Sequence, residues 1–94
     1  MTIQERLDQL PVKITRALQP SFIFIIKESI IQHFPIREWS APKILLELNQ
    51  RLGPNFESKT WKNQLVCWNQ SQNLLLIIPK YTSLQQLKSE IDSH

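Results

Sequence analysis

The sequence predicts an α+β domain in which a small helical bundle packs on a two-stranded antiparallel hairpin, with a short helix at the C-terminal end. Up to about residue 53 the apolar residues recur at helical spacing, and between residues 64 and 78 they form runs typical of strands. The chain of 94 residues also contains a single glycine. A fold with many tight turns needs more positions at which φ is positive, so the composition favours helices.

Length and composition indicate one ordinary globular domain. We take residues 1–94 as that domain, with frayed ends at 1–3 and 90–94. Hydrophobic residues make up 41% of the chain and charged residues 20%, which is typical of globular proteins. The apolar run from Phe22 to Ile26 is far shorter than the ~20 residues that cross a bilayer. No secretory signal is visible, so we expect a cytoplasmic protein without a membrane partner.

Two short helices are expected at the N-terminal end. Thr2 and Glu5 have the spacing of a capping box, which predicts a helix that stops before Pro11. A second helix is expected over residues 12–18, and it must end early because Pro20 follows.

Residues 21–34 are predicted to form the main core helix. The apolar residues of this segment lie on two sides of a helical projection: Phe22, Ile25, Ile26, Ile30 and Phe34 on one side, and Ile23, Phe24 and Ile31 on the second. A buried strand over 22–26 would give a similar pattern. The helix is favoured because the polar residues Lys27, Glu28, Gln32 and His33 share the remaining side.

The next helix has clear signals at both ends. Ser40 is a typical N-cap, Pro42 is tolerated in the first turn, and Gly53 is a typical C-cap. These signals predict a helix over 41–52, followed by a loop at 54–60.

The pattern then changes to that of a hairpin. Residues 64–68 and 73–78 are expected to be strands, joined by the polar connection 69–72. Thr82 and Gln85 have the spacing of a capping box, which predicts the short C-terminal helix.

The sequence offers no catalytic constellation. His33 and His94 are the only histidines and Cys67 is the only cysteine, so no metal-ligand set and no nucleophile with a His–acid pair can be assembled. One glycine excludes a Gly-rich phosphate loop. We therefore expect no autonomous enzyme, no metal and no cofactor, and we interpret Cys67 as a buried strand residue.

The distribution of charge favours a nucleic-acid partner. The net charge is +3, and acidic residues are absent from 9–27 and from 58–89. The basic residues of these stretches include Lys13, Arg16, Lys27, Lys59, Lys62 and Lys80, with Trp61 and Trp68 among them. Ammonium groups bind phosphates, and flat rings stack on unpaired bases. The alternative is that both tryptophans belong to the core.

Three segments carry a resemblance to a known family: "IIKESIIQHF", "WSAPKILLELNQRLG" and "WKNQLVCWNQSQNLLLIIP". Over about residues 20–80 the chain resembles the substrate-binding domain of tRNA(Ile)-lysidine synthetases. The resemblance implies a non-catalytic accessory domain that docks tRNA, or another structured RNA, for an enzyme carried on a separate catalytic protein. The phosphate contacts that it implies are Lys13, Arg16, Lys27, Lys43, Lys59, Lys62 and Lys80, and the implied stacking platform is Trp61 or Trp68.

Two other functions remain open. The apolar surface of residues 21–34 is larger than one short chain easily covers, which favours a protein-interaction adaptor or a small self-associating dimeric regulator. Its partner face would be formed by Phe22, Ile23, Phe24, Ile31 and Phe34. A third hypothesis is a winged-helix DNA-binding domain, with 41–52 as the recognition helix and the hairpin as the wing.

Overall fold

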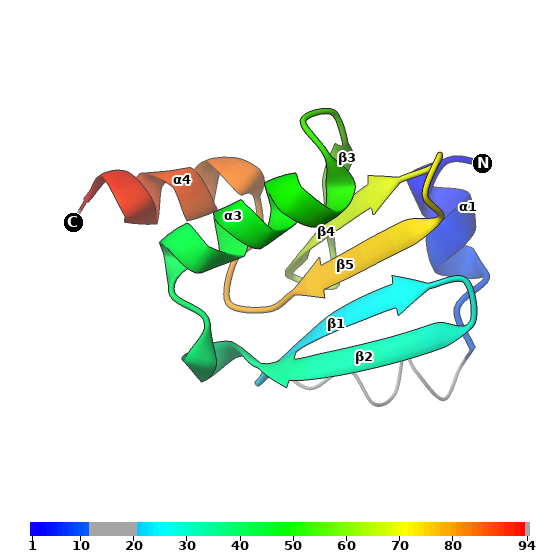
Figure 1. Cartoon of the computed structure of the whole chain (residues 1–94), viewed down its shortest axis with the longest axis horizontal. Helices are drawn as coiled ribbons and strands as arrows, with labels where there is room; N and C mark the ends of the chain where they lie inside the picture. Colours follow the sequence, from blue (N-terminus) through cyan, green and yellow to red (C-terminus); the bar gives the residue numbers. More distant parts are fainter. Residues whose placement is uncertain (12–20, 94) are drawn as a thin grey trace.

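The computed structural model describes residues 1–11 and 21–93. These residues form a five-stranded antiparallel sheet in the order β2-β1-β5-β4-β3, with helices packed on it (Figure 1). The strands are β1 (Phe22–Lys27), β2 (Ile30–Pro35), β3 (Glu57–Trp61), β4 (Gln64–Asn69) and β5 (Leu74–Ile78). The helices are α1 (Ile3–Asp8), the 3₁₀ turn η1 (Ile36–Glu38), α3 (Ala41–Leu52) and α4 (Leu84–Asp92).

The prediction of a helical bundle on a two-stranded hairpin is therefore wrong, although the broader α+β class holds. The main error concerns residues 21–34, which form the hairpin β1–β2 and not a helix. β1 pairs with β5 as well as with β2, so Ile26 lies beside Leu75 in the middle of the sheet. The β-branched and aromatic residues of β1 fit that setting better than a helix, and the sheet overrides their helical spacing.

The second error concerns β3, which was expected to be a loop. β3 is an edge strand with mostly polar residues, so it shows no apolar alternation. A two-residue turn connects it to β4, with φ values of 50° at Lys62 and 61° at Asn63. Two successive positive φ values identify a type I′ turn, which matches the twist of a hairpin. The β4–β5 hairpin, which the winged-helix hypothesis took as a wing, lies inside the sheet.

Several predicted elements are confirmed. Thr2 and Glu5 form the expected capping box of α1. The Oγ of Ser40 accepts a hydrogen bond from the Lys43 N–H at the start of α3, and Gly53 ends that helix with a φ of 83°. β4 and β5 lie within a residue of their predicted positions, and the C-terminal helix forms as α4. The capping box expected from Thr82 and Gln85 is wrong by one residue, because the N-cap is Ser83, whose Oγ accepts from the Gln86 N–H over 3.1 Å. The short helix expected over 12–18 lies outside the described residues.

The sheet separates the described core into two layers, because successive side chains of a strand point to opposite faces. α3 and α4 cover one face, and we call their layer the α3-side core. Its fully buried members are Ile23, Ile44, Leu48, Leu52, Leu65, Cys67, Leu76, Ile78 and Leu87. α1 covers the other face, and its layer, the α1-side core, includes Ile3, Leu7, Leu10, Phe24, Ile26, Val66, Trp68, Leu75 and Ile77.

Candidate functional site

The predicted phosphate-binding lysines do not gather on one face of the molecule. Lys27 is the cross-strand partner of Leu74, whose side chain belongs to the α3-side core. Lys59 is the partner of Val66, which belongs to the α1-side core. Directly opposed residues of neighbouring strands share a face of the sheet, so Lys27 and Lys59 lie on opposite faces.

Two further lysines contact groups of their own protein. The Lys43 Nζ lies 5.3 Å from the centre of the Trp39 ring. The Lys80 Nζ lies 3.6 Å from a carboxylate oxygen of Glu90 and 5.6 Å from the centre of the Tyr81 ring. Lys13 and Arg16 lie outside the described residues. The predicted phosphate-binding lysines that the structure describes are thus distributed over α3, both faces of the sheet, the β3–β4 turn and the segment that follows β5.

One small basic and aromatic group does form, at the end of β3. Lys59 and Trp61 are two positions apart on the same strand, and the Lys62 Nζ lies 5.0 Å from the centre of the Trp61 ring. Trp61 is half-buried against the α1-side core, and the Lys59 Nζ donates a hydrogen bond to the Gln4 side chain. Trp68 is only 1% exposed, so its ring is not accessible to a base.

The predicted partner face is also divided by the sheet. Ile23 and Phe24 are core residues, with 0% and 9% of their surfaces exposed, and they cannot form a docking surface. Phe22 and Phe34 are half-buried. Ile31 alone of that set is well exposed, at 41%, and its neighbour Ile30 is 64% exposed. The apolar surface on this side of the described protein therefore belongs to β2.

β2 is an edge strand with hydrogen-bonding groups that point away from the sheet. The Ile36 N–H donates to the Ser21 carbonyl over 2.9 Å, which marks that pair as hydrogen-bonded within the β1–β2 ladder. Hydrogen-bonded and non-hydrogen-bonded pairs alternate along antiparallel strands. With the observed register, Phe34, Gln32 and Ile30 use their backbone groups toward β1. The N–H and carbonyl groups of Ile31 and His33 therefore point outward.

The two edges of the sheet differ in a way that sequence reasoning missed. β3 carries Glu57 and Lys59, and charged side chains protect an edge from pairing with another chain. The residues of β2 carry no Lys, Arg, Asp or Glu, and Ile30 to His33 are all exposed. The signal was present as two adjacent isoleucines in a segment without charge, but it points to an edge only when the strand order is known.

The tip of the β1–β2 hairpin is fixed to α1. Arg6 is a buried residue of α1, and one of its terminal nitrogens donates to the carbonyl oxygen of Glu28 over 2.7 Å. Arg6, Glu28 and Ile31 share the wall of a cavity of about 250 Å³. This contact holds the exposed hairpin against the body of the protein.

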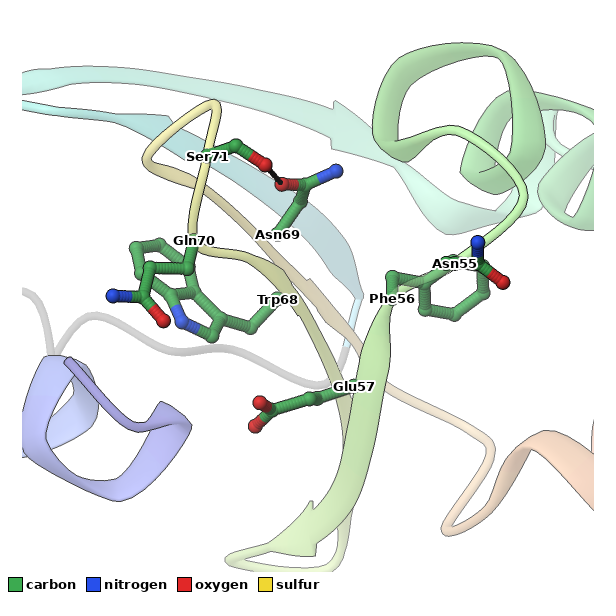
Figure 2. Close-up of a pocket in the computed structure, with 7 residues that line it drawn as sticks. All are labelled: Asn55, Phe56, Glu57, Trp68, Asn69, Gln70 and Ser71. Carbon is green, nitrogen blue, oxygen red and sulfur yellow. Dashed lines mark hydrogen bonds between the residues drawn. The ribbon is translucent and has the colours of Figure 1, made fainter.

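A second hollow lies between the start of β3 and the β4–β5 turn, and Figure 2 shows the residues that line it. Its volume is about 330 Å³. Two of its polar side chains, those of Asn69 and Ser71, form hydrogen bonds within the turn. The Asn69 side-chain oxygen accepts from the Ser71 hydroxyl over 2.9 Å and from the Gln72 N–H over 3.3 Å. The amide nitrogen of Asn69 donates to the Leu52 carbonyl at the end of α3. Asn69 is thus committed to joining the turn to α3, and we assign no ligand to this hollow.

The described residues contain no group of three or more His, Cys, Asp or Glu side chains able to hold a metal ion. No helix among them combines the length and apolar character needed to cross a membrane. In comparisons with known proteins, no family model, no curated protein and no solved structure matches the chain.

Proposed function

We propose that this protein is a protein-interaction module and that β2 is its docking element. The proposal rests on one observation: among the described residues, β2 is an exposed, uncharged edge strand, and its Ile31 and His33 point their N–H and carbonyl groups away from β1. A strand from a partner that lies alongside β2 would extend the sheet by main-chain hydrogen bonds. This mode of recognition relies on the strand edge and needs no pocket.

The side chains of β2 would add apolar contacts to those hydrogen bonds. Ile31 points to the same face as its cross-strand partner Ile26, the α1 face, whereas Ile30 points to the opposite face with Lys27. A partner strand would therefore contact an isoleucine on each face of the sheet. The Arg6 contact fixes the hairpin before binding, so little conformational freedom is lost when the partner arrives.

The test uses synthetic strand-forming peptides of varied sequence as probes and follows the backbone amides of the protein by NMR. We expect the Ile31 and His33 amide signals to shift most. The variant His33→Pro removes one outward N–H group and should weaken peptide binding at least ~10-fold. The matched control is Ser58→Pro, which removes an outward N–H from the β3 edge and should leave binding unchanged.

This proposal fails if peptide binding survives His33→Pro, or if the shifted signals map to β3 instead of β2. Peptides that shift no amide signal of β2 at millimolar concentration also contradict it.

A specific observation supports RNA binding as a second candidate function: Lys59, Trp61 and Lys62 lie within four positions of one another at an exposed hairpin end. Their ammonium groups would contact phosphates while the open side of the indole stacks on a base. The resemblance to the substrate-binding domain of tRNA(Ile)-lysidine synthetases favours tRNA as the ligand.

This second candidate is tested with labelled tRNA at several salt concentrations. The double variant Lys59→Glu/Lys62→Glu should weaken binding at least ~10-fold and flatten its salt dependence. The control is Arg37→Glu/Lys88→Glu, which changes the net charge equally but lies on η1 and α4, at exposed residues outside the predicted phosphate contacts. Equal losses in the two double variants would show a response to net charge alone and would refute a site at the β3 hairpin.

A further inference from the structure

We infer that the strand taken up by β2 is β2 of a second copy of this chain, antiparallel to the first, with a two-fold axis beside Gln32. The inference rests on the proposed function, because it names the partner of the same docking edge. Three features of β2 support it: the position of its outward backbone groups, the side chains that would face each other across the two copies, and the charges at the two ends of the strand.

The backbone of β2 is self-complementary about Gln32. Ile31 and His33 point their N–H and carbonyl groups outward and are placed symmetrically around Gln32. When two copies meet antiparallel, Ile31 of one copy can exchange both hydrogen bonds with His33 of the second copy. Gln32 then faces its own symmetry mate as a non-hydrogen-bonded pair. Pro35 has no N–H to offer, so it limits the ladder to this central part.

The same register brings compatible side chains together. On the α3 face of the sheet, Ile30 lies opposite Phe34 of the second copy. On the α1 face, Ile31 lies opposite His33 of the second copy. Aromatic rings opposite β-branched residues are among the favourable cross-strand pairs. At the axis the Gln32 amides lie side by side, and amide groups can donate to and accept from one another.

The charges beyond the strand favour the antiparallel arrangement. The hairpin tip before β2 carries Lys27 and Glu28, and the segment after it carries Arg37 and Glu38, all of them exposed. Antiparallel pairing places the tip of one copy beside the far end of the second copy, so an end with one basic and one acidic residue meets an end with one of each sign. Parallel pairing would place Glu28 beside its own symmetry mate, and like charges that face each other are destabilising.

An interface made by one edge strand is small, so the dimer should be weak. Interfaces of this size lie at the low end of specific protein contacts. We expect a monomer–dimer equilibrium at micromolar concentrations, measured by sedimentation equilibrium on the full chain. His33→Pro should shift the equilibrium to monomer, whereas Ser58→Pro should leave it unchanged.

The register is tested by disulfide cross-linking of the purified variant Gln32→Cys. A residue that opposes its own mate in a non-hydrogen-bonded pair has a Cβ–Cβ distance of about 4.5–5.5 Å, close to the geometry of a disulfide. We expect a covalent dimer as the main product of mild oxidation. Gln32 is exposed, so the variant should fold, and circular dichroism checks this.

The matched control is Ile30→Cys, on the same strand and the same face. In the inferred register Ile30 lies about 13 Å along the strand from Ile30 of the second copy, too far for a disulfide. This variant should stay uncross-linked. Ile31→Cys and His33→Cys report the two neighbouring registers, because each would oppose itself if the axis moved by one residue.

Each outcome bears on the inference. A Gln32→Cys dimer without an Ile30→Cys dimer supports it. A wild-type chain that stays monomeric at millimolar concentration overturns it, as does preferred cross-linking at Ile31→Cys or His33→Cys. A monomer that still binds strand peptides through Ile31 and His33 refutes only the second copy and leaves the docking edge in place. If neither peptides nor a second copy use β2, both proposals fail.

Discussion

Replacing Trp68 with alanine should lower the free energy of unfolding by about 3–5 kcal/mol, the range found for large aromatic residues in cores. Trp68 is 1% exposed and packs in the α1-side core. A domain of this length has a total stability of roughly 5–14 kcal/mol. The variant is therefore expected to be close to the limit of folding at room temperature, and urea unfolding followed by circular dichroism measures the loss.

The matched variant Trp68→Phe separates packing from hydrogen bonding. The Trp68 Nε1 is buried and has no hydrogen-bond partner among the described residues. Removing the indole nitrogen therefore breaks no bond, and phenylalanine should restore more than half of the stability lost in Trp68→Ala. An alanine variant that loses less than ~1 kcal/mol would contradict a fully packed α1-side core.

The Cys67 thiol is expected to be inert while the protein is folded. Cys67 is 0% exposed in the α3-side core, and burial raises the pKa of its thiol from 9.0 to about 12. The thiolate is the reactive form, and three pKa units reduce its population roughly 1000-fold. An aromatic disulfide reagent at pH 8 should react with the folded chain at least ~100-fold more slowly than with the urea-unfolded chain.

The same shift predicts a loss of stability at alkaline pH. The folded state keeps the proton of Cys67 while the unfolded state loses it above about pH 9. The unfolded state then binds fewer protons, so the free energy of unfolding falls as the pH rises from 9 to 12. Burial also raises the pKa of the Tyr81 hydroxyl, so the Cys67 contribution is isolated as the difference between wild type and Cys67→Ala. Equal slopes in the two proteins would contradict a buried, protonated thiol.

Because the Cys67 thiol is expected to be unreactive, the cysteine of the Gln32→Cys variant is the thiol expected to form the cross-link. A covalent dimer of that variant can therefore be assigned to position 32. The sequence contains no other cysteine. A covalent dimer formed by the wild-type chain under the same mild oxidation would show that Cys67 is accessible and would contradict its burial.

Local chemistry determined which parts of the fold could be predicted. α3 has a serine cap at one end and a glycine cap at the other, and both signals act within a few residues. The strands β4 and β5 were also found, because the five residues of β5 are all apolar and a polar turn precedes them. Signals of this kind do not depend on what lies elsewhere in the chain.

The wrong secondary-structure predictions concern elements whose conformation depends on strands that are distant in the sequence. The apolar run of β1 has helical spacing by coincidence, and its place between β2 and β5 makes it a strand. The polar pair Glu28-Ser29 between two apolar runs was the available signal for a hairpin. β3 was missed because a polar edge strand has the composition of a loop.

The candidate site depended even more on the pairing of the strands. Lys27 and Lys59 can belong to one basic surface only if their side chains point to the same face of the sheet. The register places them on opposite faces. Ile31 and Ile23 are equally apolar in the sequence, yet one is 41% exposed and the other 0%. Strand order, which no local pattern contains, decides which of them can meet a partner.

The unequal edges of the sheet also set a limit on how far assembly can proceed. If two copies join through β2, the β2 edges of both copies are used at once, and each outer boundary of the combined sheet of described strands is a β3 strand with Glu57 and Lys59. A contact that uses the same patch on both subunits closes on itself and leaves nothing for a third molecule to extend. Association through β2 should therefore stop at a pair and should not propagate into fibres, even at high protein concentration.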